Sequence, residues 1–336
     1  MVRIAINGFG RIGRMFLRTI MLDPQARKQI EVIAINIGPA QPESSAHIFM
    51  YDTHMGTYPG TATFNKETNE LIVDGTPIKV YAQKDISLLP WQLIGIDWVV
   101  ECSGHATQRA DAELHKRAGA RAVLISAPAH DEDITIIPGI NQDAFSKVKH
   151  TIVSLGSCTT NAFIPMVYVI DKEFKIVNGF MNTVHAYTNS QHLLDSEDKD
   201  WRRARAAALN IIPTSTGASK TLAKVLPALG DKISSTALRV PVAKVSFIDF
   251  TFVAQKSVTT QNLTAAFENA ATTYLKNIVT VTYEQLVSSD FSGNPSSVII
   301  DMRLLMVQGT IAKVSGWYDN EWGYSCRLRD FLMMVA

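Results

Sequence analysis

The sequence has few cysteines, no long apolar run and no excess of charge of either sign. The three cysteines, Cys102, Cys158 and Cys326, are odd in number and form no CxxC pair. No secretory leader precedes the first predicted strand, so we exclude a disulfide-stabilised secreted domain and expect a cytoplasmic location. The longest apolar runs, such as residues 163–170, are far shorter than the roughly 18 residues of a membrane span.

The charge balance limits the kinds of partner that the chain can attract. It has 32 Lys and Arg residues and 31 Asp and Glu residues, which leaves a net charge of +1. Such a chain has no global electrostatic drive toward nucleic acid or anionic lipid. We therefore expect neither a nucleic-acid partner nor a membrane, and any basic site must be local.

The length and the hydrophobic pattern indicate a globular α/β protein. The 336 residues, of which 46% are hydrophobic, correspond to about two domains. Strands are predicted at 3–7, 31–36, 96–101, 122–125 and 151–154, and helices at 11–22 and 108–118. This alternation is typical of parallel βαβ units in a doubly wound sheet.

The pattern changes after about residue 157. Longer apolar runs follow at 179–186, 235–240, 245–254 and 311–318. Their lengths and alternation favour a mixed or antiparallel sheet. We therefore predict a doubly wound dinucleotide-binding domain at 1–157 and an α+β catalytic domain with a mixed or antiparallel sheet at 158–319.

A glycine-rich turn, GFGRIG at residues 8–13, follows the first strand and precedes the first helix. Gly8 permits the tight turn, Gly10 lets the backbone approach a pyrophosphate, and Gly13 lets the helix pack against the strand. The start of the helix adds free N–H donors for the anion. This context favours dinucleotide binding over a loop with incidental glycines.

The second strand lacks the acidic residue that usually follows it in such a unit. It ends at Asn36 and continues with Ile37. A carboxylate there would bind a ribose hydroxyl and repel a 2′-phosphate, so its absence permits NADP. No arginine follows to hold that phosphate, so an NAD enzyme that uses Asn36 and backbone contacts stays open.

Cys158 follows a strand and begins a helical pattern, a position where free N–H groups and the helix dipole favour a thiolate. The alternative is a small buried hydrophobe, and Pro165 is expected to kink the helix. His185 ends an apolar run and is the candidate base. The other histidines show no ligand spacing, so we predict no metal. A thiolate where the two halves meet, beside a nicotinamide, indicates aldehyde oxidation.

Two segments are candidates for phosphate binding. Residues 214–220 place hydroxyls before a helical pattern at 222–229, although simple N-capping explains most such clusters. The arginines at 202–205, together with Arg239, offer charge-assisted contacts to phosphate. The alternative for the arginine cluster is a solvated face or a subunit interface.

Six motifs together resemble phosphorylating glyceraldehyde-3-phosphate dehydrogenases. They occur in that family's order from about residue 3 to residue 331, which is nearly the whole chain. The motifs are NGFGRIGR (7–14), SCTTN (157–161), TVHAYT (183–188), TGA (216–218), LRVP (238–241) and WYDNEWGY (317–324).

The resemblance implies that Cys158 is the nucleophile, that His185 activates it, and that Asn320 orients the nicotinamide carboxamide. The implied phosphate ligands are Thr188 and Arg239 for the substrate phosphate, and Ser157, Thr159, Thr216 and Gly217 for inorganic phosphate. The implied cofactor contacts, with those of the glycine-rich turn and strand end, are Gly8, Gly10, Arg11, Ile12, Asn36, Ile37, Lys84, Ser103, Gly104, Ser126 and Asn320.

The implied reaction converts glyceraldehyde 3-phosphate and inorganic phosphate reversibly to 1,3-bisphosphoglycerate, in glycolysis or gluconeogenesis. A Cys158 thiohemiacetal transfers a hydride to the nicotinamide, and phosphate then attacks the thioester. The resemblance also implies a homotetramer and a C-terminal helix at 320–336 that returns to the cofactor domain.

The chain departs from the family pattern at a few positions. Ile37 stands where many NAD-specific members have Asp, Ala162 where many have a second cysteine, and Ser190 where members often have Asp. Residues 201–210 are similar to the NADP-using biosynthetic branch. We therefore expect NADP to be preferred, with NAD possible. Erythrose-4-phosphate dehydrogenase, which shares the nucleophile, and a non-catalytic dinucleotide-binding regulatory protein are the alternatives.

Overall fold

The structure is a computed structural model that describes all 336 residues. The chain divides into two compact units. The first contains residues 1–138, 142–156 and 325–336, and the second contains residues 139–141 and 157–324. The last helix, α8 (Trp322–Val335), therefore begins in the second unit and ends in the first.

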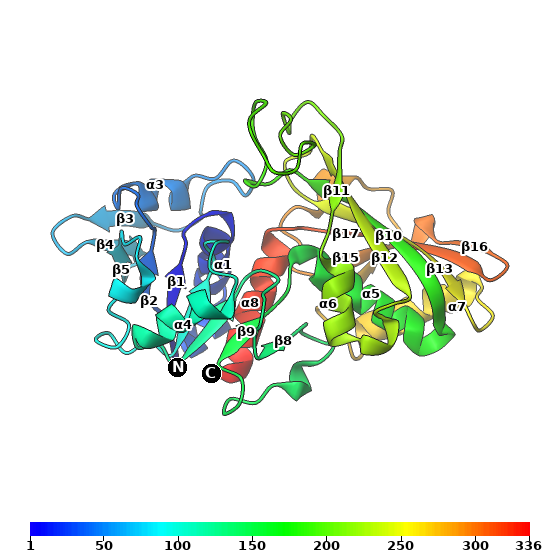
Figure 1. Ribbon diagram of the computed structural model, residues 1–336, viewed down its shortest axis with the longest axis horizontal. Helices are drawn as coiled ribbons and strands as arrows, with labels where there is room; N and C mark the ends of the chain where they lie inside the picture. The colour runs from blue at the N-terminus through cyan, green and yellow to red at the C-terminus, as the bar shows by residue number, and fades with distance from the viewer. The chain divides into compact units, whose positions relative to one another are not determined.

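The first unit is built on a nine-stranded sheet in the order β3-β4-β5-β2-β1-β6-β7-β9-β8 (Figure 1). Its strands are β1 (Val2–Asn7), β2 (Ile30–Asn36), β3 (Ala62–Asn65), β4 (Glu70–Val73), β5 (Thr76–Tyr81), β6 (Trp98–Glu101), β7 (Ala122–Ile125), β8 (Ile134–Thr135) and β9 (Ile152–Ser154). Its helices are α1 (Arg11–Met21), α2 (Pro24–Gln29), α3 (Ser44–Met50) and α4 (Arg109–Arg117), with short 3-10 turns at Ile86–Leu88 and Gln142–Ala144.

Neighbouring strands in the run β5-β2-β1-β6-β7-β9-β8 all pair in parallel. At the other edge, β4 pairs antiparallel with both β3 and β5. Every residue of β6, β7 and β9 is buried. Strands of a parallel sheet covered on both faces read as continuous apolar runs, which is why the sequence revealed them. The order reverses on either side of β1, and ligands of doubly wound sheets bind at such a point, beyond the carboxyl ends of the strands.

The second unit has an eight-stranded mixed sheet in the order β11-β12-β10-β13-β17-β15-β14, with β16 paired to β17. Its strands are β10 (Ile176–Ala186), β11 (Ile212–Ser215), β12 (Ile233–Val240), β13 (Ser246–Ala254), β14 (Val279–Thr282), β15 (Val298–Asp301), β16 (Met306–Gln308) and β17 (Ile311–Tyr318). Its helices are α5 (Cys158–Phe174), α6 (Ala218–Val225), α7 (Thr260–Thr272) and the start of α8, with 3-10 turns at Pro227–Leu229, Ser288–Phe291 and Met302–Leu304.

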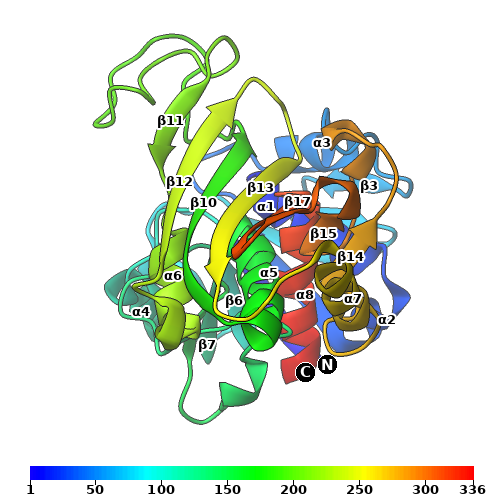
Figure 2. The same ribbon diagram turned by 90° about the vertical axis from the view of Figure 1, so that its right-hand side faces the viewer.

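Helix α5 packs against this sheet and contacts strands β10, β13, β15 and β17 (Figure 2). Along β13 buried and partly exposed residues alternate, so one face of the strand is turned to the core. Phe163 of α5 meets Phe250 of β13 with ring centroids 5.1 Å apart. The predicted fold class, a doubly wound parallel-rich sheet followed by a mixed and mostly antiparallel sheet, is confirmed.

Helix α5 has 17 residues and includes Pro165, where the sequence predicts a kink. One local expectation differs from the structure. The helix predicted at 222–229 instead begins at Ala218 and ends at Val225. Pro227 restricts the residue before it, and Leu226 accordingly leaves the helical region with φ −127° and ψ 74°.

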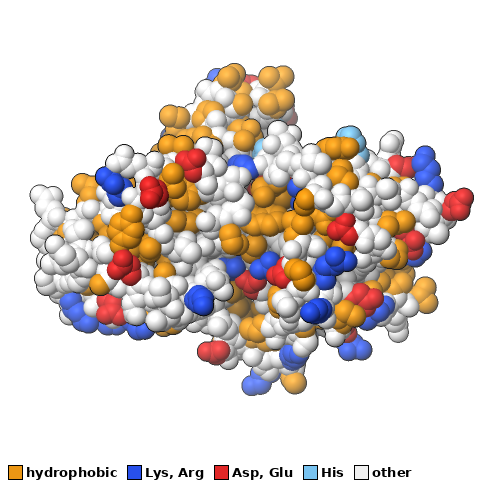
Figure 3. All heavy atoms as spheres, turned by 180° about the vertical axis from the view of Figure 1, so that it is seen from behind, with side chains coloured by type: hydrophobic (Ala, Val, Ile, Leu, Met, Phe, Trp, Pro, Cys, Tyr) orange, Lys and Arg blue, Asp and Glu red, His pale blue; other side chains and the backbone are white.

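Basic and acidic side chains are interspersed on the face shown in Figure 3, in keeping with the net charge of +1. No helix combines the length and the apolar character that crossing a bilayer requires.

Asp52, which follows α3, joins this helix to the start of α1. Its buried carboxylate pairs with Arg11, with Arg11 Nη2 donating at 3.0 Å, and accepts the backbone N–H groups of His54 and Met55 at 3.0 and 2.9 Å. Burial raises the pKa of Asp52, but the hydrogen bonds from Arg11 and the backbone outweigh it and hold the pKa at about 2.

An Asp52→Asn variant therefore tests whether this ion pair stabilises the fold. Because the native pKa lies below the unfolded value, the ionised carboxylate stabilises the native state above about pH 4, and this is lost as the pH falls toward 2. We expect the variant to be less stable by about 2 kcal/mol at pH 7. Thermal unfolding of both proteins should show a gap in Tm at pH 7 that narrows at pH 3. The exposed Asp231→Asn change is the control, and a gap independent of pH would contradict the assignment.

Candidate active site

Cys158 is the first residue of α5, and the local sequence forms that helix start. Ser157 is the N-cap: its hydroxyl accepts the N–H of Thr160 at 3.2 Å, and its own N–H donates to Thr160 Oγ1 at 2.7 Å. This capping box satisfies two backbone donors and fixes the first turn. The Cys158 thiol is therefore held at the positive end of the helix dipole.

His185 lies within reach of the thiol. Its Nε2 is 3.4 Å from Cys158 Sγ, and the imidazole is only 4% exposed. Its Nδ1 is 2.7 Å from the carbonyl oxygen of Ala186. A carbonyl only accepts, so Nδ1 carries the proton and Nε2 turns its lone pair toward the thiol. In this tautomer His185 can take the proton of Cys158.

Arg239 is placed beside this histidine by strand register. His185 of β10 pairs directly with Arg239 of the parallel strand β12. Arg239 Nη1 donates to the same Ala186 carbonyl at 3.0 Å and to Thr188 Oγ1 at 3.4 Å, and it lies 3.0 Å from Nδ1 of His185. Arg239 Nε is buried and has no hydrogen-bond partner. A guanidinium with an unused donor beside hydroxyl groups suits a phosphate.

Burial and this cation shift the pKa values of the pair. Burial, and then the charge of Arg239, lower the pKa of His185 to about 3. Burial also raises the pKa of the Cys158 thiol, although Arg239 and Thr159 oppose it. Burial of the Cys158 thiol therefore opposes the effect of the helix dipole, which favours a thiolate.

A second cluster of hydroxyls lies at the start of α6. Thr216 Oγ1 accepts the N–H of Ala218 at 3.3 Å, and Gly217 occupies the N-cap position without a side-chain cap. Arg203 is joined to the preceding strand: its Nε donates to Thr214 Oγ1 at 2.8 Å and its Nη2 to the Ser215 carbonyl at 3.4 Å.

The three arginines at 202–205 have different surroundings. Arg203 alone reaches this cluster, whereas Arg205 pairs with Asp195 at 2.7 Å and Arg202 is exposed. The sequence did not distinguish the three arginines as candidate phosphate ligands. The hydrogen bonds to β11 distinguish Arg203 from the other two.

Polar side chains behind Cys158 form a network that sequence reasoning missed. The hydroxyl of Tyr318 is 3.0 Å from Thr159 Oγ1 and 2.8 Å from Thr183 Oγ1, and all three residues are buried. Ser246 Oγ donates to Asn320 Oδ1 at 3.2 Å. One signal was available, because Ser246 is a polar residue at a buried position of the alternating strand β13.

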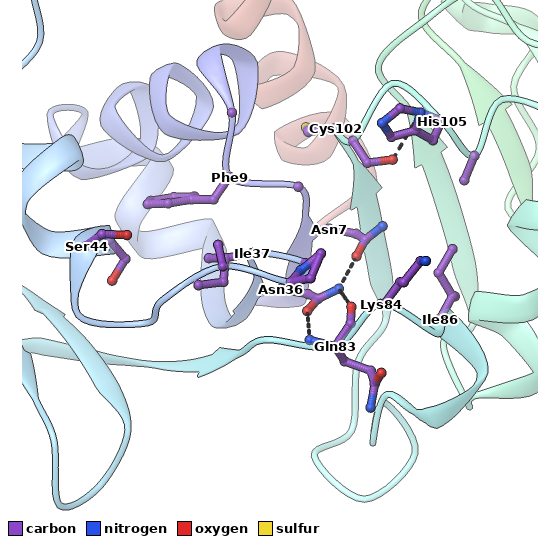
Figure 4. A pocket seen from close by; sticks show the side chains of 18 of the residues that line it. Asn7, Phe9, Asn36, Ile37, Ser44, Gln83, Lys84, Ile86, Cys102 and His105 are labelled. Carbon is purple, nitrogen blue, oxygen red and sulfur yellow. Dashed lines mark hydrogen bonds between the residues drawn. The ribbon is translucent and has the colours of Figure 1, made fainter.

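A separate cavity of about 590 Å³ lies in the first unit, at the carboxyl ends of β1, β2, β5 and β6 (Figure 4). Six predicted cofactor residues line it: Gly8, Gly10, Asn36, Ile37, Lys84 and Ser103. Five others, Arg11, Ile12, Gly104, Ser126 and Asn320, are not among its lining residues. Its lining also includes Phe9, Ser44 and Gln83, which the sequence did not single out, and it contains no carboxylate.

The glycine turn and the asparagines shape this cavity. Gly8 has φ +94°, and a Cβ there would lie 2.5 Å from Ser103 N, so only glycine fits. The Asn36 amide donates to Asn7 Oδ1 and to the Gln83 carbonyl and accepts the Gln83 N–H, as the dashed lines in Figure 4 show. The Asn36 side chain therefore holds the cavity wall through hydrogen bonds within the protein.

A buried carboxylate supports the same wall. Glu101 accepts hydrogen bonds from the Asn7 amide at 2.5 Å and from Ser103 N at 2.6 Å. His115 Nε2 lies 3.1 Å from Glu101, and Trp91 Nε1 donates to His115 Nδ1 at 3.0 Å. Since Nδ1 accepts, the neutral ring carries its proton on Nε2 and donates it to Glu101. A buried hydrogen-bond network thus supports the cavity wall. Lys84 is the one lysine or arginine that lines the cavity.

Comparisons with known proteins agree with this arrangement. The family described as "Glyceraldehyde 3-phosphate dehydrogenase, NAD binding domain" matches residues 2–109, and "Glyceraldehyde 3-phosphate dehydrogenase, C-terminal domain" matches residues 157–320. The chain is 47% identical over 337 aligned residues to glyceraldehyde-3-phosphate dehydrogenase of Streptomyces coelicolor. It is 44% identical over 336 residues to glyceraldehyde-3-phosphate dehydrogenase 2 of Bacillus subtilis. Each alignment covers 100% of this chain and 98% of the relative.

The proximity of Arg239 to His185 gives a prediction about the titration of the imidazole. Because the cation lowers the pKa of His185, Arg239→Gln should raise that pKa by about one unit or more. The measurement is the NMR titration of His185 in a Cys158→Ser background, which removes the coupled thiol. Arg239→Lys keeps a cation and should leave the pKa low. An unchanged titration in Arg239→Gln would show that burial alone sets the pKa.

Proposed function

The chain belongs to the glyceraldehyde-3-phosphate dehydrogenase family and has that dehydrogenase activity, and we propose how its residues carry out the reaction and which cofactor they favour. The observation that supports the proposal is the pairing of Cys158 Sγ with His185 Nε2 at 3.4 Å, beside Arg239. The substrates that the family implies are glyceraldehyde 3-phosphate and inorganic phosphate.

Cys158 is the nucleophile in this proposal. His185 takes the thiol proton through Nε2, and the sulfur adds to the aldehyde carbon to form a thiohemiacetal. The imidazolium then stabilises the oxyanion. A nicotinamide cofactor held by the cofactor domain and Asn320 would supply the acceptor for the hydride. The resulting thioester on Cys158 is attacked by inorganic phosphate, which releases the acyl phosphate and restores the thiol, and every step is reversible.

Two groups of residues hold the phosphates. Thr188 and Arg239 bind the phosphate of the substrate, and an anion there offsets the charge that disfavours the His185 imidazolium. Ser157, Thr159, Thr216 and Gly217 surround the inorganic phosphate. Arg203 belongs with this second group, because it contacts Thr214 and Ser215 directly before it.

Residues 1–157 form the cofactor domain, joined by the C-terminal helix at 320–336, and residues 158–319 the catalytic domain. The Gly8 turn, where a side chain would collide with Ser103, fits a closely approaching pyrophosphate. Gly10, Arg11, Ile12, Asn36, Ile37, Lys84, Ser103, Gly104 and Ser126 complete the proposed cofactor contacts. Asn320 binds the nicotinamide carboxamide.

NADP is the proposed preferred cofactor, and NAD the secondary one. Ile37 lines the cavity where a carboxylate would repel a 2′-phosphate, and no acidic side chain lines the cavity. Lys84 supplies a cation for that phosphate.

The family resemblance implies a homotetramer, and large apolar side chains exposed in the segment 193–211, including Trp201 at 86% and Leu209 at 80%, support a subunit interface there. Exposed apolar patches of this kind mark interaction surfaces. A cytoplasmic location stays a prediction from the cysteine content.

The first test follows reduced-cofactor absorbance with glyceraldehyde 3-phosphate and inorganic phosphate. Cys158→Ser should lower kcat by about 10⁴-fold or more while the circular dichroism spectrum is unchanged, because the hydroxyl cannot replace the thiolate. Cys326→Ser makes the same replacement of a thiol by a hydroxyl in α8, and it should leave kcat unchanged. Erythrose 4-phosphate is the rival substrate, and turnover of that sugar alone, or of neither, would reject the proposal.

The second test concerns the cofactor. Wild-type kcat/KM should be higher with NADP than with NAD, and Ile37→Asp should lower the NADP value by about tenfold or more, because like charges then face each other. Ile37→Asn adds polarity without charge and serves as the control. An equal or higher wild-type kcat/KM with NAD would contradict the proposed preference.

A further inference from the structure

Glu101 is a buried carboxylate beside the cofactor cavity, and the proposed reaction does not use it. It is the last residue of β6, and its side chain is only 1% exposed. A charged group that is removed from water destabilises the fold unless it is paired or fully hydrogen-bonded. The partners of this carboxylate therefore indicate what it does.

Each partner of Glu101 can only donate a hydrogen bond. Asn7 Nδ2 at 2.5 Å and His115 Nε2 at 3.1 Å share Oε2, and Ser103 N lies 2.6 Å from Oε1. His115 Nε2 carries the ring proton, because Nδ1 accepts from Trp91 Nε1 at 3.0 Å. Such a set of donors needs a group that accepts at both ends. A carboxylate does so, and a carboxamide of the same shape does not.

The contact with Asn7 continues as a chain of amides along the rim of the cavity (Figure 4). Parallel register sets Asn7 directly between Asn36 and Glu101. The Gln83 backbone donates to Asn36 Oδ1 and accepts from Asn36 Nδ2, both at 2.9 Å, so the Asn36 amide has one orientation. Its Nδ2 also donates to Asn7 Oδ1 at 2.7 Å, which turns Asn7 Nδ2 to Glu101. The chain therefore fits in one direction only, and that direction ends on an acceptor.

The contact with Ser103 holds the loop after β6 against the glycine turn. A Cβ on Gly8 would lie 2.5 Å from Ser103 N, so the two backbones touch at this point. Glu101 accepts the N–H of Ser103 and thereby fixes the loop where the turn passes it. Gly8 and Ser103 both line the cavity, so a displacement of this loop would change the cavity at the turn.

We propose that Glu101 is a positioning residue for the dinucleotide, although it does not line the cavity. One carboxylate oxygen holds Ser103 at the glycine turn, and the other fixes the amides of Asn7 and Asn36. The inference rests on the proposed function, which assigns the cavity to the cofactor. It adds that binding needs an acceptor at both ends of residue 101. NADP and NAD depend on it alike, because both meet the glycine turn.

Glu101→Gln keeps the shape of the side chain and tests the need for a second acceptor. Whichever way the new amide turns, its NH₂ group faces at least one N–H donor. We expect the Kd of NADP and the Kd of NAD each to rise about fivefold or more, measured by titration calorimetry without substrate at about pH 8. A smaller rise with either cofactor would overturn the proposal.

Asp133→Asn is the matched control for a general loss of stability. The Asp133 carboxylate accepts the N–H groups of Thr151 and Ile152 at 2.7 and 2.9 Å in the same unit, and it does not line the cavity. This variant should lower Tm but leave both Kd values within about twofold of wild type. A change as large as that of Glu101→Gln would show that the loss of any such carboxylate weakens cofactor binding, which would contradict the positioning role.

An Asn7→Asp background reverses the expected sign. Two carboxylates then face each other across the contact with Glu101, and their repulsion at about pH 8 should weaken cofactor binding. Glu101→Gln in this background gives the new carboxylate an NH₂ partner and keeps an oxygen for Ser103. The mismatch moves to His115, which does not line the cavity.

The double variant should therefore bind NADP and NAD about threefold or more tightly than Asn7→Asp alone. A residue that only stabilises the fold would weaken binding in both backgrounds, so the absence of a gain would overturn the proposal. If Glu101→Gln does not fold by itself, this comparison decides.

Measuring Kd without substrate keeps these tests independent of turnover. Loss of wild-type turnover on glyceraldehyde 3-phosphate, together with the expected changes in Kd, would reject the proposed function and keep the positioning role. Normal turnover with Kd values that Glu101→Gln does not change would reject the positioning role and keep the proposed function.

Discussion

The parallel pairing of β10 with β12 is the constraint on which the site depends. It sets His185 directly beside Arg239, so that both side chains lie on the same face of the sheet. A slip of one residue in this register would turn one of the two to the opposite face. Helix α5 then brings Cys158 to the free nitrogen of the imidazole. The capping box at Ser157 and the apolar packing of α5 on the sheet hold that approach.

Burial gives this site its electrostatic character. It lowers the pKa of His185 and raises the pKa of Cys158, and the cation of Arg239 further disfavours the imidazolium. Arg239 nonetheless favours the thiolate, so the two charges that the reaction needs are affected in opposite directions.

Internal hydrogen bonds determine what the cofactor cavity can offer. Asn7 and Asn36 are polar residues at the ends of their strands, yet their amides bind each other, Glu101 and Gln83. The cavity consequently presents backbone groups, a glycine turn and Lys84. In the second unit, the hydroxyl of Ser246 likewise accepts the N–H of Ala186 in β10 and donates to Asn320 Oδ1. In both places buried polar groups find their hydrogen-bond partners within the protein.

The sequence by itself determined the alternation of strands and helices, the glycine turn and the candidate nucleophile and base. These are local signals, since apolar periodicity and helix starts depend on neighbouring residues. It did not reveal the antiparallel edge strands β3 and β4, the choice of Arg203 among three arginines, or the hydrogen bonds of Ser246 and Tyr318. Only the tertiary structure decided these, because each depends on contacts between residues far apart in the chain. It also decided the burial of Cys158, which raises the pKa of its thiol and which no local pattern encodes.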